Sequence, residues 1–292
     1  MVLFDGRKNM LKGNLHTHTT CSDGKLTPEQ SAALYKGMGF DFVAFTDHRK
    51  VCCAGRTEDG FTVLSGAEFD FNLPAQVIHI VGIGLPLNFA DDYRAERGAQ
   101  SIIDKINAAG GVPIFAHPSW SLNTPAIMAA MRNVDIAEIY NTFSGSPWNG
   151  DRADSSVLLD ECACAGKRYR FVASDDSHWY AGEAGKSYTV VAAEENSEAA
   201  IVAALKAGEF YASQGPTVEL LEREGNTLRV KCSPVNRVWF SSNLPWSAKR
   251  CVNGEGITEA TYEMLPQNGE HFVRVTVEDK DGRRAWLNSI EV

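Results

Sequence analysis

The chain has 292 residues, of which 44% are hydrophobic and 22% are charged, and its formal net charge is -9. This length allows one large α/β domain and a small additional module. The acidic balance, without clusters of Lys and Arg, excludes a surface for nucleic-acid backbones, and no apolar run is long enough to cross a bilayer.

The first two thirds of the chain alternate between segments typical of strands and of helices. Thr27-Pro28-Glu29-Gln30 carries the N-cap, the early proline and the acid that open a helix. The apolar run Phe42-Val-Ala-Phe45 indicates a strand that is buried on both faces of a parallel sheet. We expect strands at 11–18, 42–45, 61–64, 77–83, 112–116, 136–140 and 170–173, and helices at 27–37, 95–109, 125–131, 155–165 and 197–207.

Helical periodicity stops at 208–216, and the alternation typical of strands follows it. We expect strands at 218–222, 228–232, 238–240, 272–277 and 286–290. The pattern predicts a small all-β sandwich domain over residues 212–292, after a first domain over residues 1–211. Trp239, Trp246 and Trp286 could form a stacking surface, but packing is the simpler interpretation.

Six of the seven histidines lie at or near predicted strand ends, beside or near acidic residues. A single histidine more often satisfies hydrogen bonds than binds a metal. The joint pattern reverses this weighting, because side chains two residues apart in a strand project to one side, as in the pairs His16/His18 and Asp176/His178. Imidazole and carboxylate together bind Zn, Mn or Fe in open sites. The histidines are His16, His18, His48, His79, His117 and His178.

Glu68 follows the predicted strand at 61–64 and is the best candidate for a carboxylate that bridges two cations. Ligands that follow successive parallel strands favour a barrel, where functional groups gather at the carboxyl ends of the strands. A doubly wound sheet would gather them at one switch point. Nucleotide-cradling folds lose support, because the chain has neither a GxGxxG after a strand nor a P-loop.

The seven cysteines are odd in number and form no paired CxxC framework, which favours a reducing compartment. The first residues, Met1 to Arg7, lack the apolar region of a signal peptide. We therefore expect a cytoplasmic protein. Cys21 could be a soft ligand, but a small buried residue near the site is the simpler interpretation.

The first two thirds of the chain resemble the PHP (polymerase and histidinol phosphatase) superfamily in a set of ordered motifs. These are Asn14-Leu-His-Thr-His18, Ser22-Asp-Gly24, Phe45-Thr-Asp-His48, Gly66-Ala-Glu68, Phe115-Ala-His-Pro118, Ala137-Glu-Ile-Tyr-Asn141 and Ser174-Asp-Asp-Ser-His178. The β module, with its ending Arg284-Ala-Trp-Leu-Asn-Ser-Ile290, further resembles the branch that includes carbaryl hydrolases.

The resemblance implies a PHP fold, a distorted (β/α)7 TIM-like barrel, that holds two or three divalent ions of Mn, Zn or Fe. It assigns the first metal to His16, His18, Glu68 and Asp176, the second to Glu68, His79 and His117, and the third to Asp23, His48 and His178. Asp23 departs from the histidine of many relatives, which favours a harder ion such as Mn or Fe. Of the doubled acid Asp175-Asp176, only Asp176 stands two residues before His178.

The implied function is that of a metal-dependent phosphoesterase, which acts on a small phosphorylated metabolite through a metal-bridging hydroxide. Glu68 and Asp176 would act by holding the ions, and Arg152 is a candidate for orienting the phosphate. Two alternatives stay open: a carboxylic ester, carbamate or amide hydrolase with the same site, and a non-enzymatic binding protein with structural metals. The oligomeric state is open as well.

Two further groups border the predicted ligands. Glu138 could orient a histidine ligand from behind, although a structural role is equally consistent with its position. Four aromatic residues follow ligand-bearing segments and are candidates for a pocket that accepts a planar or apolar substrate. They are Trp120, Trp148, Trp179 and Tyr180.

Overall fold

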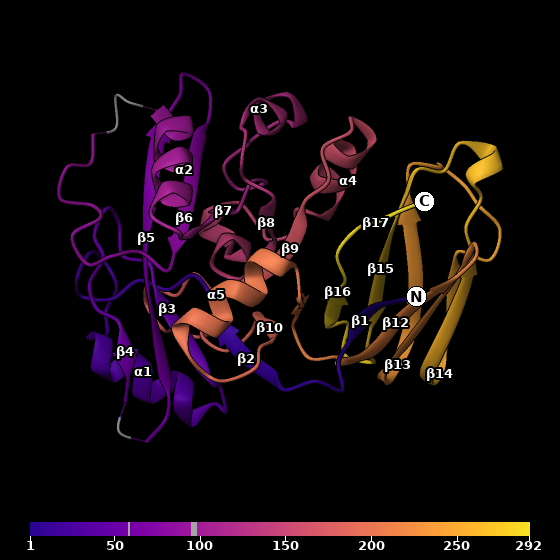
Figure 1. The fold of residues 1–292 in the computed structure, drawn as a ribbon, viewed down its shortest axis with the longest axis horizontal. Coiled ribbons are helices and arrows are strands. Elements are labelled where there is room, and N and C mark those ends of the chain that lie inside the picture. The colour runs from indigo at the N-terminus through magenta and orange to yellow at the C-terminus, as the bar shows by residue number, and fades with distance from the viewer. Residues whose placement is uncertain (58, 95–97) are drawn as a thin grey trace.

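The computed structural model describes residues 1–57, 59–94 and 98–292. Figure 1 shows a part with helices beside a part made almost entirely of strands, with both termini at the strand-rich part. The helices are α1 (Pro28–Gly37), α2 (Gly98–Ala108), α3 (Pro125–Ala130), α4 (Ser156–Cys164) and α5 (Glu198–Ala207), and the 3-10 helices are η2 (Phe143–Gly145), η3 (Pro147–Asn149) and η4 (Pro266–Asn268). Residues 95–97 of the helix predicted at 95–109 lie outside the described residues.

The strands of the helical part pair in a mixed order. They are β2 (Met10–Asn14), β3 (Phe42–Phe45), β4 (Gly55–Arg56), β5 (Thr62–Asn72), β6 (Val77–Ile83), β7 (Val112–Phe115), β8 (Ile136–Asn141), β9 (Arg170–Ser174), β10 (Tyr188–Ala192) and β11 (Phe210–Ser213). Parallel pairs join β2, β3 and β5, and also β7, β8 and β9. An isolated parallel bridge joins Thr17 to Ser177, in the segments after β2 and β9. The fold is therefore mixed α/β with a large sheet.

Two expectations about β5 and β6 are wrong. β6 is antiparallel to both β5 and β7, where a series of parallel strands was expected. Only residues 73–76 join β5 to β6, and a crossover to a parallel strand needs a dozen or more residues. Glu68 consequently lies inside an 11-residue strand rather than beyond a short one, and His79 lies inside β6.

Local sequence signals account for the start of α1. Thr27 is the N-cap, and its hydroxyl accepts a hydrogen bond from the backbone N–H of Gln30. The Gln30 side chain in turn accepts from the backbone N–H of Thr27, which completes a capping box. Pro28 occupies the first turn, where its missing N–H has no partner to lose.

Replacing Thr27 with alanine is expected to lower the free energy of unfolding by about 1 kcal/mol, because the backbone N–H of Gln30 loses the hydroxyl that accepts its hydrogen bond. Urea denaturation of Thr27→Ala and Thr27→Ser measures the effect. The serine variant keeps the hydroxyl and should stay close to the wild type. Equal losses in the two variants would exclude the capping hydrogen bond as the cause.

The core of the helical part lies between the strands and the helices that cover them. All four residues of β3 are buried, as the apolar run predicted. One cluster packs Phe69 of β5 and Ile80 of β6 with Ile103 of α2. Another packs Leu64 of β5 with Ile201 and Leu205 of α5. Burial of these side chains holds the strand ends, and the loops after them, in a fixed arrangement.

The C-terminal part consists of strands with their own apolar cluster. They are β12 (Val218–Glu224), β13 (Thr227–Ser242), β14 (Cys251–Glu263), β15 (Phe272–Glu278), β16 (Arg284–Trp286) and β17 (Ile290–Glu291). β13 unites the two strands predicted at 228–232 and 238–240, because it pairs along its length with β12, β14 and β15. β14 was not predicted, since its mostly exposed residues show no apolar alternation.

Several contacts join the two parts. The first strand, β1 (Val2–Asp5), pairs with β12, and β11 pairs with both β10 and β16. The guanidinium of Arg274 on β15 donates two hydrogen bonds of 2.9 and 2.7 Å to the carboxylate of Asp160 on α4. The side chain of Arg274 is 4% exposed, so this ion pair is largely removed from water.

A disulfide joins Cys21 to Cys52, with Cα atoms 6.3 Å apart. The sequence favoured reduced cysteines, and for this pair that expectation is wrong, because the loops after β2 and β3 lie side by side only in the folded chain. The same bond removes Cys21 as a soft ligand. Among the described residues, no helix has the length and apolar character needed to span a membrane.

Candidate metal centre

The predicted ligands converge at one place, from loops and strands that are distant in sequence. Among the described residues, three overlapping groups have ligand atoms within 4.8 Å of one another: His18, Asp23, His48 and His178; His16, Glu68 and His117; and His16, His18 and Asp176. The Thr17–Ser177 bridge aligns the segments of His16/His18 and Asp176/His178. Two extended segments, side by side, thus supply four of the candidate ligands.

Glu68 lies at the middle of this cluster and is 2% exposed. Its Oε1 lies 2.7 Å from Nδ1 of His79 and 3.0 Å from Nε2 of His117. Its Oε2 lies 3.2 Å from Nδ1 of His48 and 3.3 Å from Nε2 of His18. The two oxygens therefore face different sets of rings, which is the geometry that a bridging carboxylate requires.

Asp176 is the second carboxylate of the cluster. Its Oδ1 lies 3.2 Å from Nε2 of His16 and 3.1 Å from Nε2 of His18. The backbone φ of Asp176 is 54°, and that of His117 is 25°, values that L-residues rarely adopt. Such backbone strain is characteristic of functional sites, where surrounding structure holds it in place.

The neighbouring acid, Asp175, faces away from the cluster. Its carboxylate accepts hydrogen bonds from the hydroxyl of Tyr35 and from the backbone N–H groups of Gly185, Lys186 and Ser187. Burial nevertheless raises the pKa of Asp175 to about 7. Asp175 thus holds the loop at 185–187 by hydrogen bonds to its backbone. This geometry agrees with the choice of Asp176, rather than Asp175, as the candidate ligand.

Replacing Asp175 with asparagine is expected to flatten the pH dependence of stability between pH 4 and 7. The raised pKa means that the folded chain holds a proton that the unfolded chain, with the ordinary value of 3.8, releases. The contribution of Asp175 is therefore complete below pH 3.8 and is lost as the pH rises toward 7. Denaturation of both proteins in chelator across this range measures it, and parallel curves would contradict the prediction.

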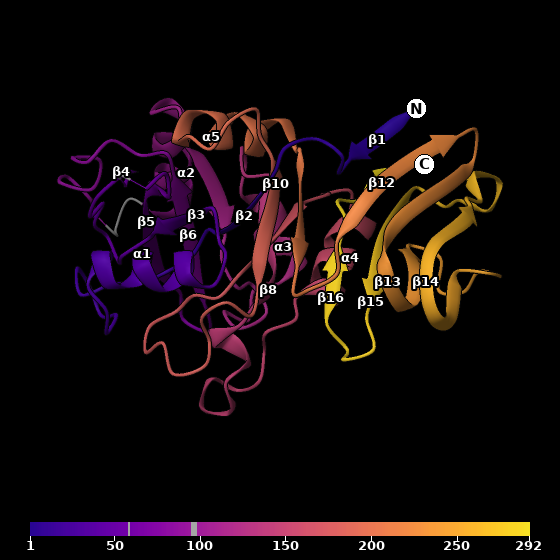
Figure 2. The same cartoon turned by 90° about the horizontal axis from the view of Figure 1, so that it is seen from below.

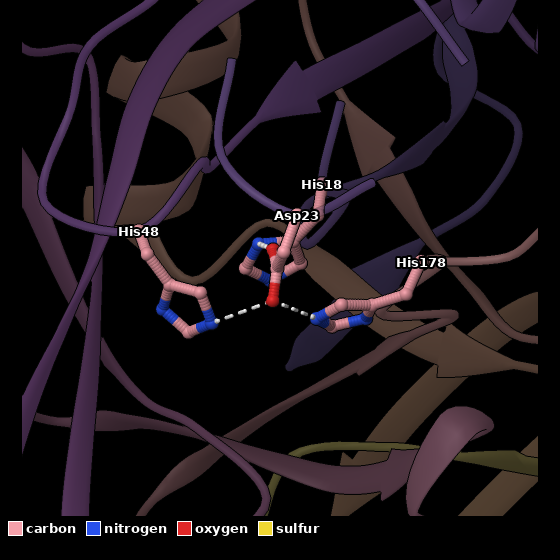
Figure 3. Close-up of side chains that lie close together, drawn as sticks. All are labelled: His18, Asp23, His48 and His178. Atoms are coloured by element: carbon pink, nitrogen blue, oxygen red, sulfur yellow. Dashed lines mark ion pairs between the residues drawn. The ribbon is translucent and has the colours of Figure 1, made fainter. Parts of the chain in front are cut away.

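Asp23, His48 and His178 meet beside His18, as Figure 3 shows. Oδ2 of Asp23 lies 3.7 Å from Nε2 of His48 and 3.6 Å from Nε2 of His178, and its Oδ1 lies 3.5 Å from Nδ1 of His18. The Asp23 side chain is 53% exposed, whereas His18 is buried. This group lies at the open side of the cluster.

The charges within the cluster stabilise one another. Burial opposes protonation of His16, but the carboxylates of Asp176, Glu138 and Glu68 outweigh it and raise the pKa of His16 well above its ordinary value. Burial also opposes ionisation of Glu68, yet the surrounding imidazoles hold the pKa of Glu68 well below its ordinary value. Burial likewise opposes ionisation of Asp176, but His16, His178 and His18 hold the pKa of Asp176 below its ordinary value. Glu68 and Asp176 are therefore ionised at neutral pH, the form that binds cations.

The donor set fits divalent metal ions. Nδ1 of His18 and Nδ1 of His48 are buried without a hydrogen-bond partner among the described residues, although each lies within 3.5 Å of a carboxylate oxygen. A buried nitrogen that faces a carboxylate oxygen without a hydrogen bond is a place where a cation can satisfy both atoms. Imidazole with carboxylate suits Zn, Mn and Fe.

Glu138 on β8 holds two ligand segments from behind. Its Oε1 lies 2.9 Å from Nδ1 of His16, which leaves Nε2 of His16 to face the cluster. Its Oε2 accepts hydrogen bonds from the backbone N–H of His117 and from the side chain of Asn141. Carboxylates placed in this way fix the tautomer and orientation of a metal-binding histidine.

Replacing Glu138 with glutamine is expected to weaken metal binding by roughly 10- to 100-fold, because the amide no longer orients His16 as a charged acceptor does. Titration of the metal-free protein with Mn²⁺, followed by calorimetry, measures the change. The melting temperature of the metal-free variant should stay near that of the wild type. Unaltered affinity would show that Glu138 serves only the fold.

A cavity of about 380 Å³ opens onto the cluster. Its lining includes Trp120, Trp148 and Trp179, three of the four aromatic residues that the sequence singled out. The fourth, Tyr180, donates a hydrogen bond to the backbone oxygen of His18 and so supports the ligand loop instead. Phe143, Ser144 and Asn149 also line it, and the 3-10 turns that place them gave no sequence signal.

Arg152, the predicted phosphate-orienting residue, is exposed and is not among the described residues that line the cavity. Its backbone N–H donates to the backbone oxygen of Ser144, so the residue belongs to the turn that follows η3. Among the described residues, Arg152 is therefore outside the lining of this cavity, and its role in orienting a phosphate stays a prediction.

The fold and the convergent ligand segments define this chain as an α/β protein of PHP-like fold. A two-domain protein from Bacteroides vulgatus that contains a predicted PHP-like metal-dependent phosphoesterase is similar, with a TM-score of 0.53 and 14% identity, over 99% of this chain and 98% of that chain. This likeness shows that the chain shares the overall mixed α/β fold of that PHP-like protein, while the (β/α)7 barrel and the C-terminal sandwich stay predictions. The likeness to the carbaryl-hydrolase branch stays a prediction.

Two further solved structures are similar over part of the chain. An amidohydrolase from Chromobacterium violaceum gives a TM-score of 0.44 with 14% identity, over 59% of this chain and 89% of that chain. A metal-dependent phosphoesterase, described as putative, from Bifidobacterium adolescentis gives 0.38 with 16% identity, over 57% and 87%. At these TM-scores neither likeness adds to the assignment of the fold. No protein-family model and no curated protein sequence matches the chain.

Proposed function

We propose that this chain is a metal-dependent hydrolase, and that it is a phosphoesterase acting on a small phosphorylated metabolite. The observation that carries the proposal is the convergence of imidazoles and ionised carboxylates on Glu68 and Asp176, at the base of an open cavity. Structural metal sites are usually closed, whereas this one faces a space that admits a small molecule.

Two or three divalent ions, of Mn, Zn or Fe, fit the donor groups. The first ion would be held by His16, His18, Glu68 and Asp176, the second by Glu68, His79 and His117, and the third by Asp23, His48 and His178. His79 belongs to none of the three tight groups among the described residues, but its Nδ1 contacts the shared Oε1 of Glu68.

Bound ions would supply Lewis acidity and lower the pKa of a coordinated water toward neutrality. The chain's own contribution is orientation. Nδ1 of His117 is held by the hydroxyl of Ser121 at 3.0 Å, and Nδ1 of His178 by the backbone oxygen of Asp176 at 2.8 Å. Each ring thus directs its Nε2 into the cluster before a substrate arrives, which is the preorganisation that catalysis needs.

A second candidate function is hydrolysis of a carboxylic ester, carbamate or amide at the same site. It is favoured by the charge of the cavity, because the described lining residues include no Lys or Arg that could pair with a phosphate. A neutral carbonyl ester needs no such cation. The phosphoesterase proposal requires that bound ions alone balance the charge of the phosphate.

We extend the proposal to the architecture that presents the site. The strands β2, β3, β5, β6, β7, β8 and β9 would form a distorted (β/α)7 barrel within residues 1–211, and residues 212–292 would form the β sandwich. The pairing order of these strands and the Thr17–Ser177 bridge between their first and last members support closure. The role of the second domain is then to support the barrel from one side.

Hydrolysis of two substrates that share one aryl leaving group tests the proposal. One is a phosphomonoester and the other a carboxylic ester, and each is offered to Mn- and Zn-reconstituted protein. Cleavage of the phosphomonoester alone is expected. Cleavage of the carboxylic ester alone would move the chain to the second function, and no cleavage of either by protein with full metal content would contradict a hydrolase.

A further inference from the structure

A row of aromatic rings leads from a candidate ligand to the rim of the cavity. Phe143 stacks on His178, with ring centroids 4.4 Å apart and an interplanar angle of 18°. Trp179 meets Phe143 edge to face at 5.5 Å, and Trp148 stacks on Trp179 at 5.3 Å and 27°. We call Phe143, Trp179 and Trp148 the aromatic ladder.

The aromatic ladder is carried by two loops that lie next to each other. Phe143 and Trp148 belong to η2 and η3, after β8, and Trp179 follows β9. In Figure 2 the segments after β8 and β9 extend together beyond the same end of these strands. The ladder and the candidate ligands line the same cavity, so a molecule that reacts at the ligands also reaches the rings.

Core packing does not account for the outer two rings. Trp148 is 65% exposed and Trp179 is 47% exposed, whereas Trp286 in the core is 1% exposed. An exposed indole leaves in water the apolar surface whose burial would otherwise stabilise the folded state. Two such rings in stacked contact at the mouth of a cavity offer a flat apolar face to a ligand. Trp120 adds a further ring, which packs edge to face on His117 at 4.9 Å.

The charge of the cavity restricts what can lie on these rings. Among the described lining residues the charged groups are Asp23, Glu68 and Asp176, all of them candidate metal ligands. The rest of the lining is aromatic, imidazole or neutral polar. A second phosphate or a carboxylate on the substrate would find no Lys or Arg among the described lining residues, so the group that stacks on the ladder carries no negative charge.

We propose that the aromatic ladder is the subsite for a planar aryl group of the substrate that carries no negative charge. The inference rests on the proposed function and adds to it the leaving group, which would be an aryl alcohol. In the net reaction water forms a bond to the phosphorus or the carbonyl carbon, the bond from that atom to the aryl oxygen breaks, and the aryl alcohol departs with one proton of the water. Binding on the rings holds the scissile bond over the ligands.

Calorimetric titration of the Mn-loaded protein tests the subsite without requiring turnover. The probes are 2-naphthol, which is flat, and its saturated counterpart decahydro-2-naphthol, which is apolar but not flat. The wild type is expected to bind 2-naphthol about tenfold more tightly than the saturated probe, the scale of one stacking contact. Trp148→Ala and Trp179→Ala should each lose about that factor, and Trp179→Phe should keep most of it.

Trp246→Ala is the matched control, because Trp246 is 77% exposed but lies outside the cavity lining, and its binding should equal the wild type. Equal affinity for both probes, or unchanged binding in both ladder variants, overturns the subsite. Hydrolysis of a 2-naphthyl ester separates the two proposals. If binding depends on the ladder but the ester is not hydrolysed, the subsite is supported and the proposed hydrolase function is contradicted. If the ester is hydrolysed but the flat probe is not preferred, the function is supported and the subsite is contradicted.

Discussion

Replacing Glu68 with glutamine is expected to reduce both the metal content and the rate of hydrolysis, the latter by about a thousandfold. Oε1 of Glu68 faces His79 and His117, while Oε2 faces His48, so the residue joins two parts of the cluster. Glutamine replaces one oxygen with an N–H₂ group that donates hydrogen bonds and binds no cation. Loss of an ion forfeits several kcal/mol of transition-state stabilisation, and each 1.4 kcal/mol is about tenfold in rate.

Mass spectrometry of the metal content, and kcat/KM on whichever of the two aryl substrates the wild type cleaves, measure these effects. Glu222→Gln on β12 is the control, because it makes the same chemical change outside the cavity lining. Its metal content and turnover should equal those of the wild type. Full metal content together with full activity in Glu68→Gln would contradict the assignment of Glu68 as a metal ligand that bridges two ions.

Replacing Asp160 with alanine is expected to lower the free energy of unfolding by about 3–5 kcal/mol, the cost of leaving a buried charge without its partner. The guanidinium of Arg274 is 4% exposed and donates two hydrogen bonds to this carboxylate. Its remaining partners, the hydroxyls of Thr276 and Ser241, carry no charge. The loss also loosens β15 from α4, so both parts of the chain should melt at a lower temperature.

Chemical denaturation of Asp160→Ala and Glu259→Ala checks this expectation. Glu259 accepts a similar pair of hydrogen bonds from Arg229, but on the exposed surface of β14. Solvent screens such a pair, so its removal should change stability little. Similar losses in both variants would mean that burial of Arg274 is not the cause.

Elements with strong local signals were predicted well. The strand at 42–45 and the strand at 77–83 have their predicted bounds, and the helix at 197–207 begins one residue later than predicted. Apolar periodicity and capping involve residues only a few positions apart. These signals can therefore be read from the sequence without knowing which distant segments meet. β14 has no such signal. Its residues become a strand because β13 offers them hydrogen bonds across a large sequence distance.

The direction of β6 and the pairing of Cys21 with Cys52 were not predicted from the sequence. β6 runs antiparallel because a short connection turns the chain back, and Cys21 reaches Cys52 because two loops adjoin at one end of the sheet. The same holds for Arg152, whose position after a turn leaves it outside the cavity lining of the described residues. A charged residue near ligands in sequence need not be near them in space.

For the site, the sequence alone determined the chemical identity of the candidate ligands, because imidazoles and carboxylates two residues apart in extended segments already share a side. It also distinguished Asp176 from Asp175 through the spacing to His178. Only the tertiary structure decided which oxygen of Glu68 faces which ring, and that exposed rings of Trp148 and Trp179 stack beside the ligands. These arrangements arise from the packing of distant strands, and burial of their apolar residues is what brings the loops together.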